Sequence, residues 1–152
     1  MSNEPTAGIR VLLVEDNEID VEITKRVLAK SGLPIRLDVA RDGEDALAAL
    51  LDAKQGPLPR LILVDLRLPG MDGAEVVRRI RRDPELGPIP VAVLTGATGD
   101  RAMLESIEAG ANMYFVKPIT AKDAAGIVDA VERYWQTIER LIRKQSKERR
   151  AA

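Results

Sequence analysis

The chain has 152 residues, 45% of them hydrophobic, so it is long enough for one compact domain with a buried core and too short for two ordinary ones. It contains no histidine and no cysteine, which excludes disulfides, zinc sites built from imidazoles or thiolates, Ser-His-Asp triads and cysteine nucleophiles. The 23 basic and 24 acidic residues nearly balance, so the overall charge predicts neither nucleic-acid binding nor attraction to a membrane surface.

The beginning of the chain carries no secretory signal pattern. No basic segment followed by an apolar run is present there, and the longest apolar runs of the chain are only strand-sized. We therefore expect a bacterial-type cytoplasmic protein without a membrane span, with residues 1–8 as a flexible N-terminus.

Five short runs rich in apolar and β-branched residues predict β-strands at 9–14, 35–39, 61–64, 91–94 and 113–116. Segments with helical periodicity separate them, and the first of these carries Ile19, Ile23, Val27 and Leu28. Strands that alternate with helices at this spacing indicate βαβ units, and nearly continuous apolar strands indicate a parallel sheet covered on both faces. The sequence therefore predicts a doubly wound α/β domain.

The last predicted helix begins after Thr120, whose spacing to Asp123 fits a capping box. Apolar residues then recur at steps of four and three, at Ala124, Val128, Val131, Trp135, Ile138 and Ile142. A helix that covers such short strands needs about 15 residues, so we expect its later turns to project beyond the sheet. The projecting stripe predicts a homodimer whose contact includes Trp135, Ile138 and Ile142.

Polar side chains follow four of the five predicted strands, at the edge where an open parallel sheet binds its ligands. Glu15 and Asp16 follow the first strand, Asp65 the third, Thr95 the fourth and Lys117 the fifth. At about 5 Å and an effective dielectric near 20, each pair of carboxylates would repel by roughly 3 kcal/mol. These carboxylates need a cation, and oxygen-only ligands favour Mg²⁺, whose remaining positions waters and phosphate oxygens can fill.

The same edge suits phosphoryl transfer. Lys117 supplies a positive charge for a phosphoryl oxygen and Thr95 a hydroxyl donor, and Asp65, after the central strand, is the best-placed carboxylate to accept the group. Taken singly, each residue has a plainer explanation, because Asp16 could cap a helix, Thr95 could begin a turn and Lys117 could be solvated. Their arrival together at the strand ends favours one magnesium-dependent phosphoryl site.

Four segments resemble motifs of the receiver domains of two-component response regulators. They are VLLVEDN (11–17), LILVDLRLPGMDG (61–73), VAVLTG (91–96) and YFVKP (114–118), in the family's order and spacing. The resemblance covers residues 9–135 and implies a five-stranded flavodoxin-like sheet of order 2-1-3-4-5, with 136–152 as a basic helical extension. EDNEIDVEIT, DLRLPGMDG and VERYWQ are further similar to the stand-alone regulators that accompany bacterial phytochromes.

The resemblance implies that Asp65 accepts a phosphoryl group from the phosphohistidine of a sensor histidine kinase, which the narrower likeness would make a bacteriophytochrome. Asp16, Asp65 and the backbone carbonyl of Arg67 would bind Mg²⁺, while Glu15 would act through a metal-bound water. The chain would then be a signalling protein that assists its own phosphorylation and dephosphorylation, rather than an enzyme.

The resemblance also assigns a switch. Thr95 would close on one phosphoryl oxygen and Lys117 would pair with another. Tyr114 would turn inward as Thr95 moves, altering the face formed by the fourth helix, the fifth strand and the fifth helix. The bond between Lys117 and Pro118 would be cis.

Two alternatives stay open. An aspartate-nucleophile phosphatase also places an aspartate after a strand and uses Mg²⁺, but Arg67 stands where its second acid belongs. A receiver fold that is never phosphorylated and serves only as a binding module is the other. No GxxxxGK loop and no GxGxxG turn follows the first strand, which argues against a nucleotide-binding module.

The 17 residues after Trp135 are too few for a DNA-binding domain, so we expect output through contact with a downstream protein or through phosphate relay. The basic residues of this segment are Arg140, Arg143, Lys144, Lys147, Arg149 and Arg150. Because cations near a helix C-terminus complement the helix dipole, we expect a solvated end that binds neither nucleic acid nor membrane.

Overall fold

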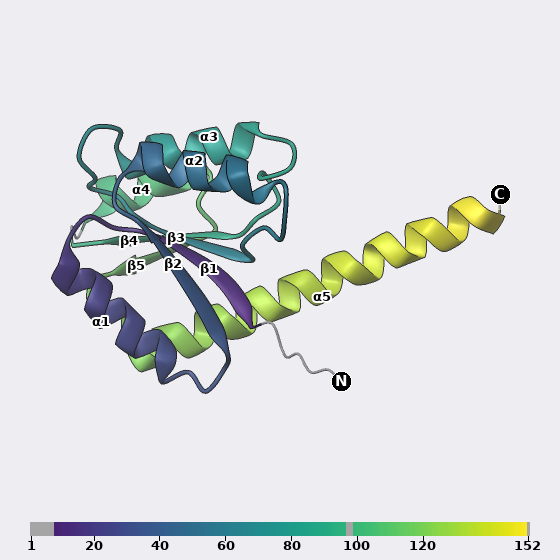
Figure 1. Ribbon diagram of the computed structural model, residues 1–152, viewed down its shortest axis with the longest axis horizontal. Helices are drawn as coiled ribbons and strands as arrows, with labels where there is room; N and C mark the ends of the chain where they lie inside the picture. The colour runs from purple at the N-terminus through teal and green to yellow at the C-terminus, as the bar shows by residue number, and fades with distance from the viewer. Residues whose placement is uncertain (1–7, 97–98, 152) are drawn as a thin grey trace.

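The computed structural model describes residues 8–96 and 99–151, in which a parallel sheet lies between two layers of helices (Figure 1). The strands are β1 (Ile9–Val14), β2 (Ile35–Ala40), β3 (Leu61–Asp65), β4 (Val91–Thr95) and β5 (Met113–Val116). The helices are α1 (Glu18–Ala29), α2 (Gly43–Ala53), α3 (Gly73–Arg82), α4 (Asp100–Ala109) and α5 (Ala121–Ala151). The strand order is β2-β1-β3-β4-β5, so the predicted fold is confirmed. Apart from Gly8, the N-terminus predicted to be flexible lies outside the described residues.

The sheet separates two apolar cores. Helices α1 and α5 cover one face and α2, α3 and α4 cover the other (Figure 1). Side chains alternate along each strand, so Val64 and Val93 pack toward α2, α3 and α4, whereas Leu63 and Leu94 pack toward α1 and α5. Every residue of β3 and β4 is buried. This burial on both faces explains why all residues of these strands except the last one of each are apolar.

Three strands, β2, β3 and β4, run one residue further than predicted, and in β3 and β4 the extra residue is a functional candidate. Asp65 is the last residue of β3 and Thr95 the last residue of β4. The ladder continues past both, since the amide of Leu66 donates to the carbonyl of Leu94 and the amide of Lys117 donates to the carbonyl of Thr95. Regular hydrogen bonding therefore holds the backbone of both candidates in place.

The apolar stripe predicted for α1 is partly wrong. Val21, Thr24 and Leu28 are the buried residues of this helix, whereas Ile19 is 70% exposed. The connection from β1 is only residues 15–17, and the Asn17 side chain caps the helix by accepting a hydrogen bond from the amide of Asp20 at 3.0 Å. This short capped connection sets the rotation of α1 against the sheet, which apolar spacing alone does not determine.

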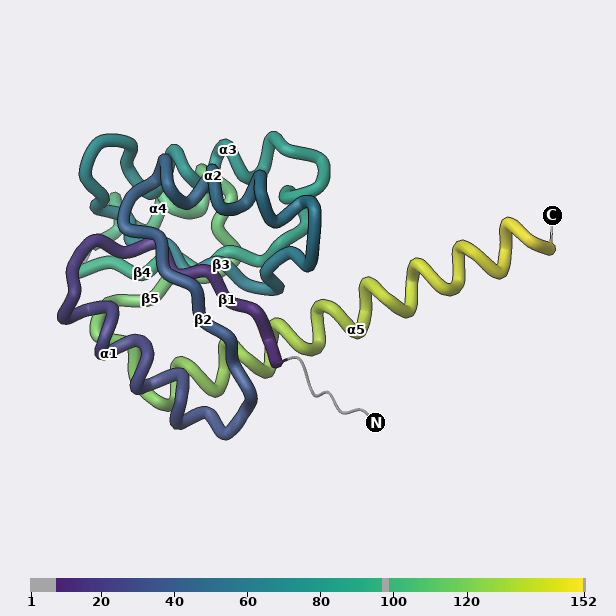
Figure 2. Tube along the Cα trace, viewed as in Figure 1, coloured from purple at the N-terminus to yellow at the C-terminus, as the bar shows by residue number. Residues whose placement is uncertain are grey.

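Helix α5 begins with the predicted capping box. The amide of Asp123 donates to Thr120 Oγ1 and the amide of Thr120 donates to Asp123 Oδ2, both at 3.0 Å. The helix buries Ala124, Ile127, Val128 and Val131, and then runs far beyond the sheet (Figure 2). It has 31 residues, and no helix in the described ranges is both long and apolar enough to cross a membrane.

Arg60 fixes the direction in which α5 leaves the domain. Its backbone carbonyl accepts a hydrogen bond from Trp135 Nε1 at 2.9 Å, and its guanidinium carbon lies 5.4 Å from the centre of the Trp135 ring. The same guanidinium pairs with Glu139 at 3.3 Å. Beyond these contacts the apolar side chains of Leu141 and Ile142 are 51% and 58% exposed. The projection predicted for the last turns is therefore present.

Gly73 allows α3 to start against the end of β3. Its amide donates to the carbonyl of Leu66 at 3.0 Å. A Cβ atom at this position would lie 2.1 Å from the carbonyl oxygen of Asp65 and 2.8 Å from the Cα of Leu66. Only glycine permits this approach, which folds the loop after β3 tightly under Asp65.

Replacing Gly73 by alanine should destabilise the domain by about 1–3 kcal/mol, because the added methyl group overlaps fixed backbone atoms. Gly126→Ala is the matched control. Gly126 lies on the exposed side of α5 with no neighbour within 4 Å of an added Cβ, so alanine there should stabilise by about 0.5–1 kcal/mol. Urea denaturation measures both, and a Gly73→Ala chain as stable as the original would contradict the packing described here.

Candidate functional site

The predicted acidic residues meet at the carboxyl end of the sheet. One carboxylate oxygen from each of Glu15, Asp16 and Asp65 lies within 4.8 Å of the others. Strands β1 and β3 are neighbours, with Val14 opposite Val64, so the residues that follow them must lie side by side. Glu15 and Asp65 are buried and Asp16 is exposed, which leaves the cluster open to solvent on one side. Three oxygen donors at this spacing suit a hard divalent cation.

Lys117 places an ammonium group among these carboxylates. Its Nζ lies 2.9 Å from Glu15 Oε1, 3.1 Å from Asp65 Oδ2 and 2.7 Å from Asp20 Oδ2. An ammonium has three N–H donors, so one donor is available for each acceptor. Because Lys117 follows the edge strand β5, its side chain reaches across the end of β4 to arrive here.

Burial shifts the pKa values of the two innermost charges. Loss of solvent raises the pKa of Glu15 to about 7, and the nearby Asp65 adds to this shift, while the hydrogen bond from Lys117 opposes it only in part. Burial alone would lower the pKa of Lys117, but its bonds to Asp20 and Glu15 and the charge of Asp65 together raise it above its ordinary value. Lys117 is therefore cationic at neutral pH, where Glu15 is close to its midpoint.

Backbone amides orient both buried carboxylates. The amide of Asn17 donates to Glu15 Oε2 at 3.2 Å, and the amide of Arg67 donates to Asp65 Oδ1 at 3.1 Å. Each carboxylate therefore divides its oxygens between a local amide and the ammonium of Lys117. This arrangement leaves Asp65 Oδ2 held by a side chain and not by the backbone.

Asp20 is the contact that the sequence reasoning missed. It lies in the first turn of α1 and makes the shortest of the three contacts to Lys117. The ordinary explanation for an acidic residue in the first turn of a helix is its favourable interaction with the helix dipole. The signal available in the sequence was its place one turn into a helix that directly follows a strand carrying site residues.

The predicted switch residues lie on β4 and β5. Thr95 is fully buried, and its neighbour Gly96 has nothing within 4 Å of an added Cβ, so there is room beside it. Tyr114 is half-buried and packs against the core on the side of α2, α3 and α4. The bond between Lys117 and Pro118 is cis, as the family resemblance implied.

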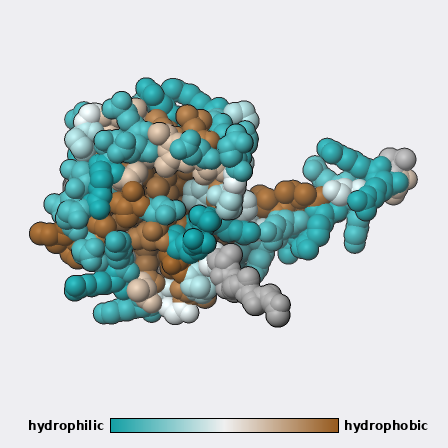
Figure 3. All heavy atoms as spheres, in the orientation of Figure 1, coloured by the Kyte–Doolittle hydropathy of each residue, from teal (hydrophilic) through white to brown (hydrophobic). Residues whose placement is uncertain are grey.

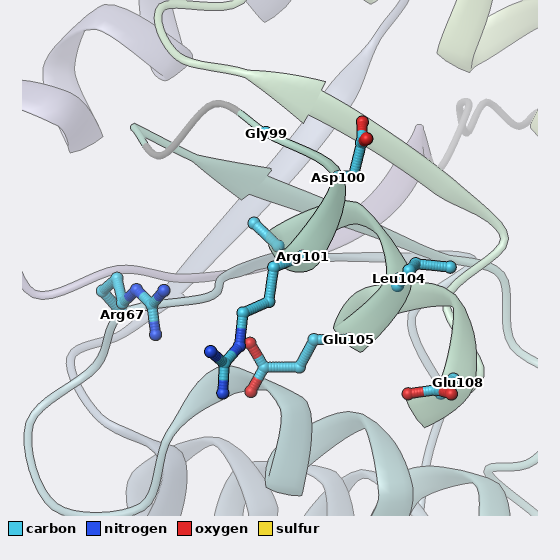
Figure 4. A pocket seen from close by; sticks show the side chains of 8 residues that line it. Arg67, Gly99, Asp100, Arg101, Leu104, Glu105 and Glu108 are labelled. Atoms are coloured by element: carbon cyan, nitrogen blue, oxygen red, sulfur yellow. The ribbon is translucent and has the colours of Figure 1, made fainter.

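A wide hollow lies next to this site, between the loop after β3 and α4 (Figure 4). It has a volume of about 1010 Å³, and Arg67 faces Arg101 and Glu105 across it. Arg67 is the one predicted metal-site residue in its lining, and that prediction concerned its backbone carbonyl. Glu15, Asp16, Asp65 and Lys117 lie outside this lining, so the cluster at the strand ends is separate from the larger hollow.

Comparison with known proteins identifies the family of this arrangement. Residues 11–131 match the response regulator receiver domain. The probable methanogenesis regulatory protein FilR2 of Methanothrix harundinacea is 38% identical over 127 residues, which is 82% of each chain. Response regulator Rcp1 of Synechocystis is 37% identical over 138 residues, which is 89% of this chain and 94% of Rcp1.

Solved structures agree with the sequence matches. The Mn²⁺-bound form of Rcp1 has a TM-score of 0.65 at 37% identity, covering 84% of this chain and 94% of that one. The phosphorylated cyanobacterial phytochrome response regulator RcpA has a TM-score of 0.70 at 34% identity, covering 87% and 96%. The narrower resemblance to phytochrome-associated regulators is thus confirmed. By its sequence match and its strand order, the chain belongs to the response regulator receiver domain family.

Proposed function

We propose that the chain accepts a phosphoryl group on Asp65 from the phosphohistidine of a histidine kinase, with Mg²⁺, as a response regulator of a two-component phosphorelay. The observation that carries this proposal is the position of Asp65, clustered with Glu15 and Asp16 and 3.1 Å from the ammonium of Lys117. These 152 residues contain no histidine, so the donor imidazole lies outside them.

The proposed metal site uses oxygen ligands only. Asp16, Asp65 and the backbone carbonyl of Arg67 would hold Mg²⁺, and Glu15 would act through a bound water. The ion supplies positive charge that offsets the carboxylates and the phosphoryl oxygens. The cluster of three carboxylate oxygens within 4.8 Å supports this assignment.

In the proposed transfer, an oxygen of Asp65 forms a bond to phosphorus while the bond between phosphorus and the donor imidazole nitrogen breaks. The nitrogen keeps the electron pair. The hydrogen bond that Lys117 Nζ now donates to Asp65 Oδ2 would shift to a phosphoryl oxygen. The Thr95 hydroxyl would donate a hydrogen bond to another phosphoryl oxygen. Tyr114 lies on β5, opposite Val93 of β4, the strand that ends in Thr95. This position supports the proposal that a movement of Thr95 changes the position of Tyr114 and so the surface formed by α4, β5 and α5.

The proposed partners follow from the family. The similarity to RcpA, a phytochrome response regulator, supports a bacteriophytochrome as the cognate kinase. Such a kinase draws its phosphoryl group from ATP, so we place the chain in the cytoplasm. Output would pass through a downstream protein that recognises the phosphorylated surface, with no role for nucleic acid or membrane.

Incubation with acetyl phosphate should add one phosphoryl group per chain, and the adduct should require both Mg²⁺ and Asp65. Intact-protein mass spectrometry measures it in the original chain, in Asp65→Asn, and in EDTA. An adduct that persists in Asp65→Asn would contradict the proposal. Steady release of phosphate from an aryl phosphate would favour an aspartate-nucleophile phosphatase, and a folded chain that takes up no phosphoryl group would favour a binding module.

Affinity for the divalent ion should fall as the pH is lowered, because the raised pKa of Glu15, about 7, leaves a proton in the cluster below that pH. A single competing proton with this pKa lowers the apparent affinity about tenfold between pH 8 and pH 6. Calorimetric titration with Mg²⁺ measures this. Glu15→Gln should bind more weakly but without the pH step, and an affinity for the original chain that is constant over this range would contradict the prediction.

We further propose that a second copy of the chain covers the projecting stripe of α5. Figure 3 shows a hydrophobic patch on α5 where the helix leaves the domain, followed by hydrophilic surface toward the C-terminus. On the predicted stripe, Trp135 and Ile138 are half-buried and Ile142 is exposed. Apolar residues at steps of three and four present one continuous side of the helix to a partner helix.

Ile142→Glu should weaken the dimer at least tenfold, since each copy loses an apolar contact and places a charge in the interface. Sedimentation equilibrium measures the dissociation constant. Gln136→Glu, on a side of the same helix that faces away from Ile138, Leu141 and Ile142, adds the same charge and should leave the dissociation constant unchanged. If the original chain is monomeric both with and without phosphorylation, the dimer does not exist.

A further inference from the structure

We propose that Asp20 is a positioning residue for the phosphoryl transfer proposed above: it holds the Lys117 ammonium so that one N–H points at the reacting carboxylate of Asp65. This inference rests on the proposed function, because it assigns Asp20 a part in that same transfer. Asp20 would touch neither the phosphoryl group nor the metal, and would act only through Lys117.

The three contacts of the Lys117 ammonium support this role. Asp20 Oδ2 lies 2.7 Å from Lys117 Nζ, closer than the oxygens of Glu15 at 2.9 Å and Asp65 at 3.1 Å. The ammonium has three N–H donors arranged tetrahedrally about nitrogen. When Asp20 and Glu15 each take one, the third is fixed in direction, and it points at Asp65 Oδ2.

The support for Asp20 is itself rigid. Asp20 belongs to the first turn of α1, and its own amide donates to Asn17 Oδ1 at 3.0 Å in the helix cap. The next residue, Val21, is buried in the core under α1, which anchors that turn to the sheet. Asp20 therefore presents its carboxylate from a fixed backbone, and not from a loop that would move with the ammonium.

Asp20 also differs from Glu15 and Asp65 in its role in the proposed reaction. Asp65 becomes the phosphorylated group, and Glu15 lies in the cluster that would bind the cation. Asp20 has neither task, so its bond to Lys117 can persist before and after transfer. An anchor that does not change during the reaction reduces the reorganisation needed to place a donor on the developing phosphoryl charge.

The competing explanation is that Asp20 only stabilises the N-terminus of α1 through the helix dipole. Glu18 is the matched control for that role, since it is the other acidic residue in the first turn of the helix. Its carboxylate pairs with Arg41 and is exposed. Glu18→Ala therefore removes an acidic group from the same turn without touching Lys117.

The test compares Asp20→Ala, Asp20→Glu, Glu18→Ala and the original chain in saturating Mg²⁺, with phosphorylation by acetyl phosphate followed by rapid quench and intact mass. For Asp20→Ala we expect the maximal rate constant to fall about fivefold or more, with the half-saturating acetyl phosphate concentration changed less than twofold. Asp20→Glu, whose longer carboxylate still reaches Lys117, should recover at least half of the loss, and Glu18→Ala should retain the original rate.

Each result decides between distinct conclusions. If the original chain forms an Asp65 adduct and Asp20→Ala forms it at the same maximal rate, the positioning role is overturned while the proposed function stands. An equal fall in Glu18→Ala would also overturn it, because helix stability would then explain the loss. If the original chain forms no Asp65 adduct, the proposed function and this inference fail together.

Discussion

The ion cluster around Lys117 is the interaction on which the site depends. Its ammonium joins Glu15, Asp20 and Asp65, which lie 102, 97 and 52 residues away along the chain. Two of these carboxylates are buried beside each other and would repel strongly without a positive charge between them. Lys117 therefore stabilises in the folded chain an arrangement of charges that would otherwise oppose folding, and it leaves a net negative site that attracts a divalent cation.

The sheet separates packing from chemistry along each strand. The middle of β3 and β4 is apolar on both faces because helices cover both, and polar groups are confined to the last residue, where the strand emerges at the edge. Gly73 then brings the start of α3 against Asp65 and Leu66. Backbone hydrogen bonds from Leu66 to Leu94 and from Gly73 to Leu66 therefore hold the chain on the C-terminal side of Asp65.

Helix α5 links this domain to a surface outside it. Its first turns are part of the core, and Trp135 and Glu139 are tied to Arg60 at the base of the sheet. The projecting turns are therefore a continuation of the domain with a defined direction. The packed turns and the projecting turns belong to one helix, which runs without interruption from Ala121 to Ala151.

The sequence by itself determined the positions of the strands and the fold class. It also determined which four of the five strands carry site residues at their ends. These features depend on local properties: apolar runs mark buried strands, and the residue after a parallel strand falls at the ligand edge whatever the rest of the chain does. Tertiary structure alone decided which side of α1 is buried, so that Ile19 is exposed and Val21 is not. It also decided the ion pair between Asp20 and Lys117 and the hydrogen bond from Trp135 to the carbonyl of Arg60. Each of these depends on the rotation and distance between elements that are remote in the chain, and no local periodicity encodes that relation.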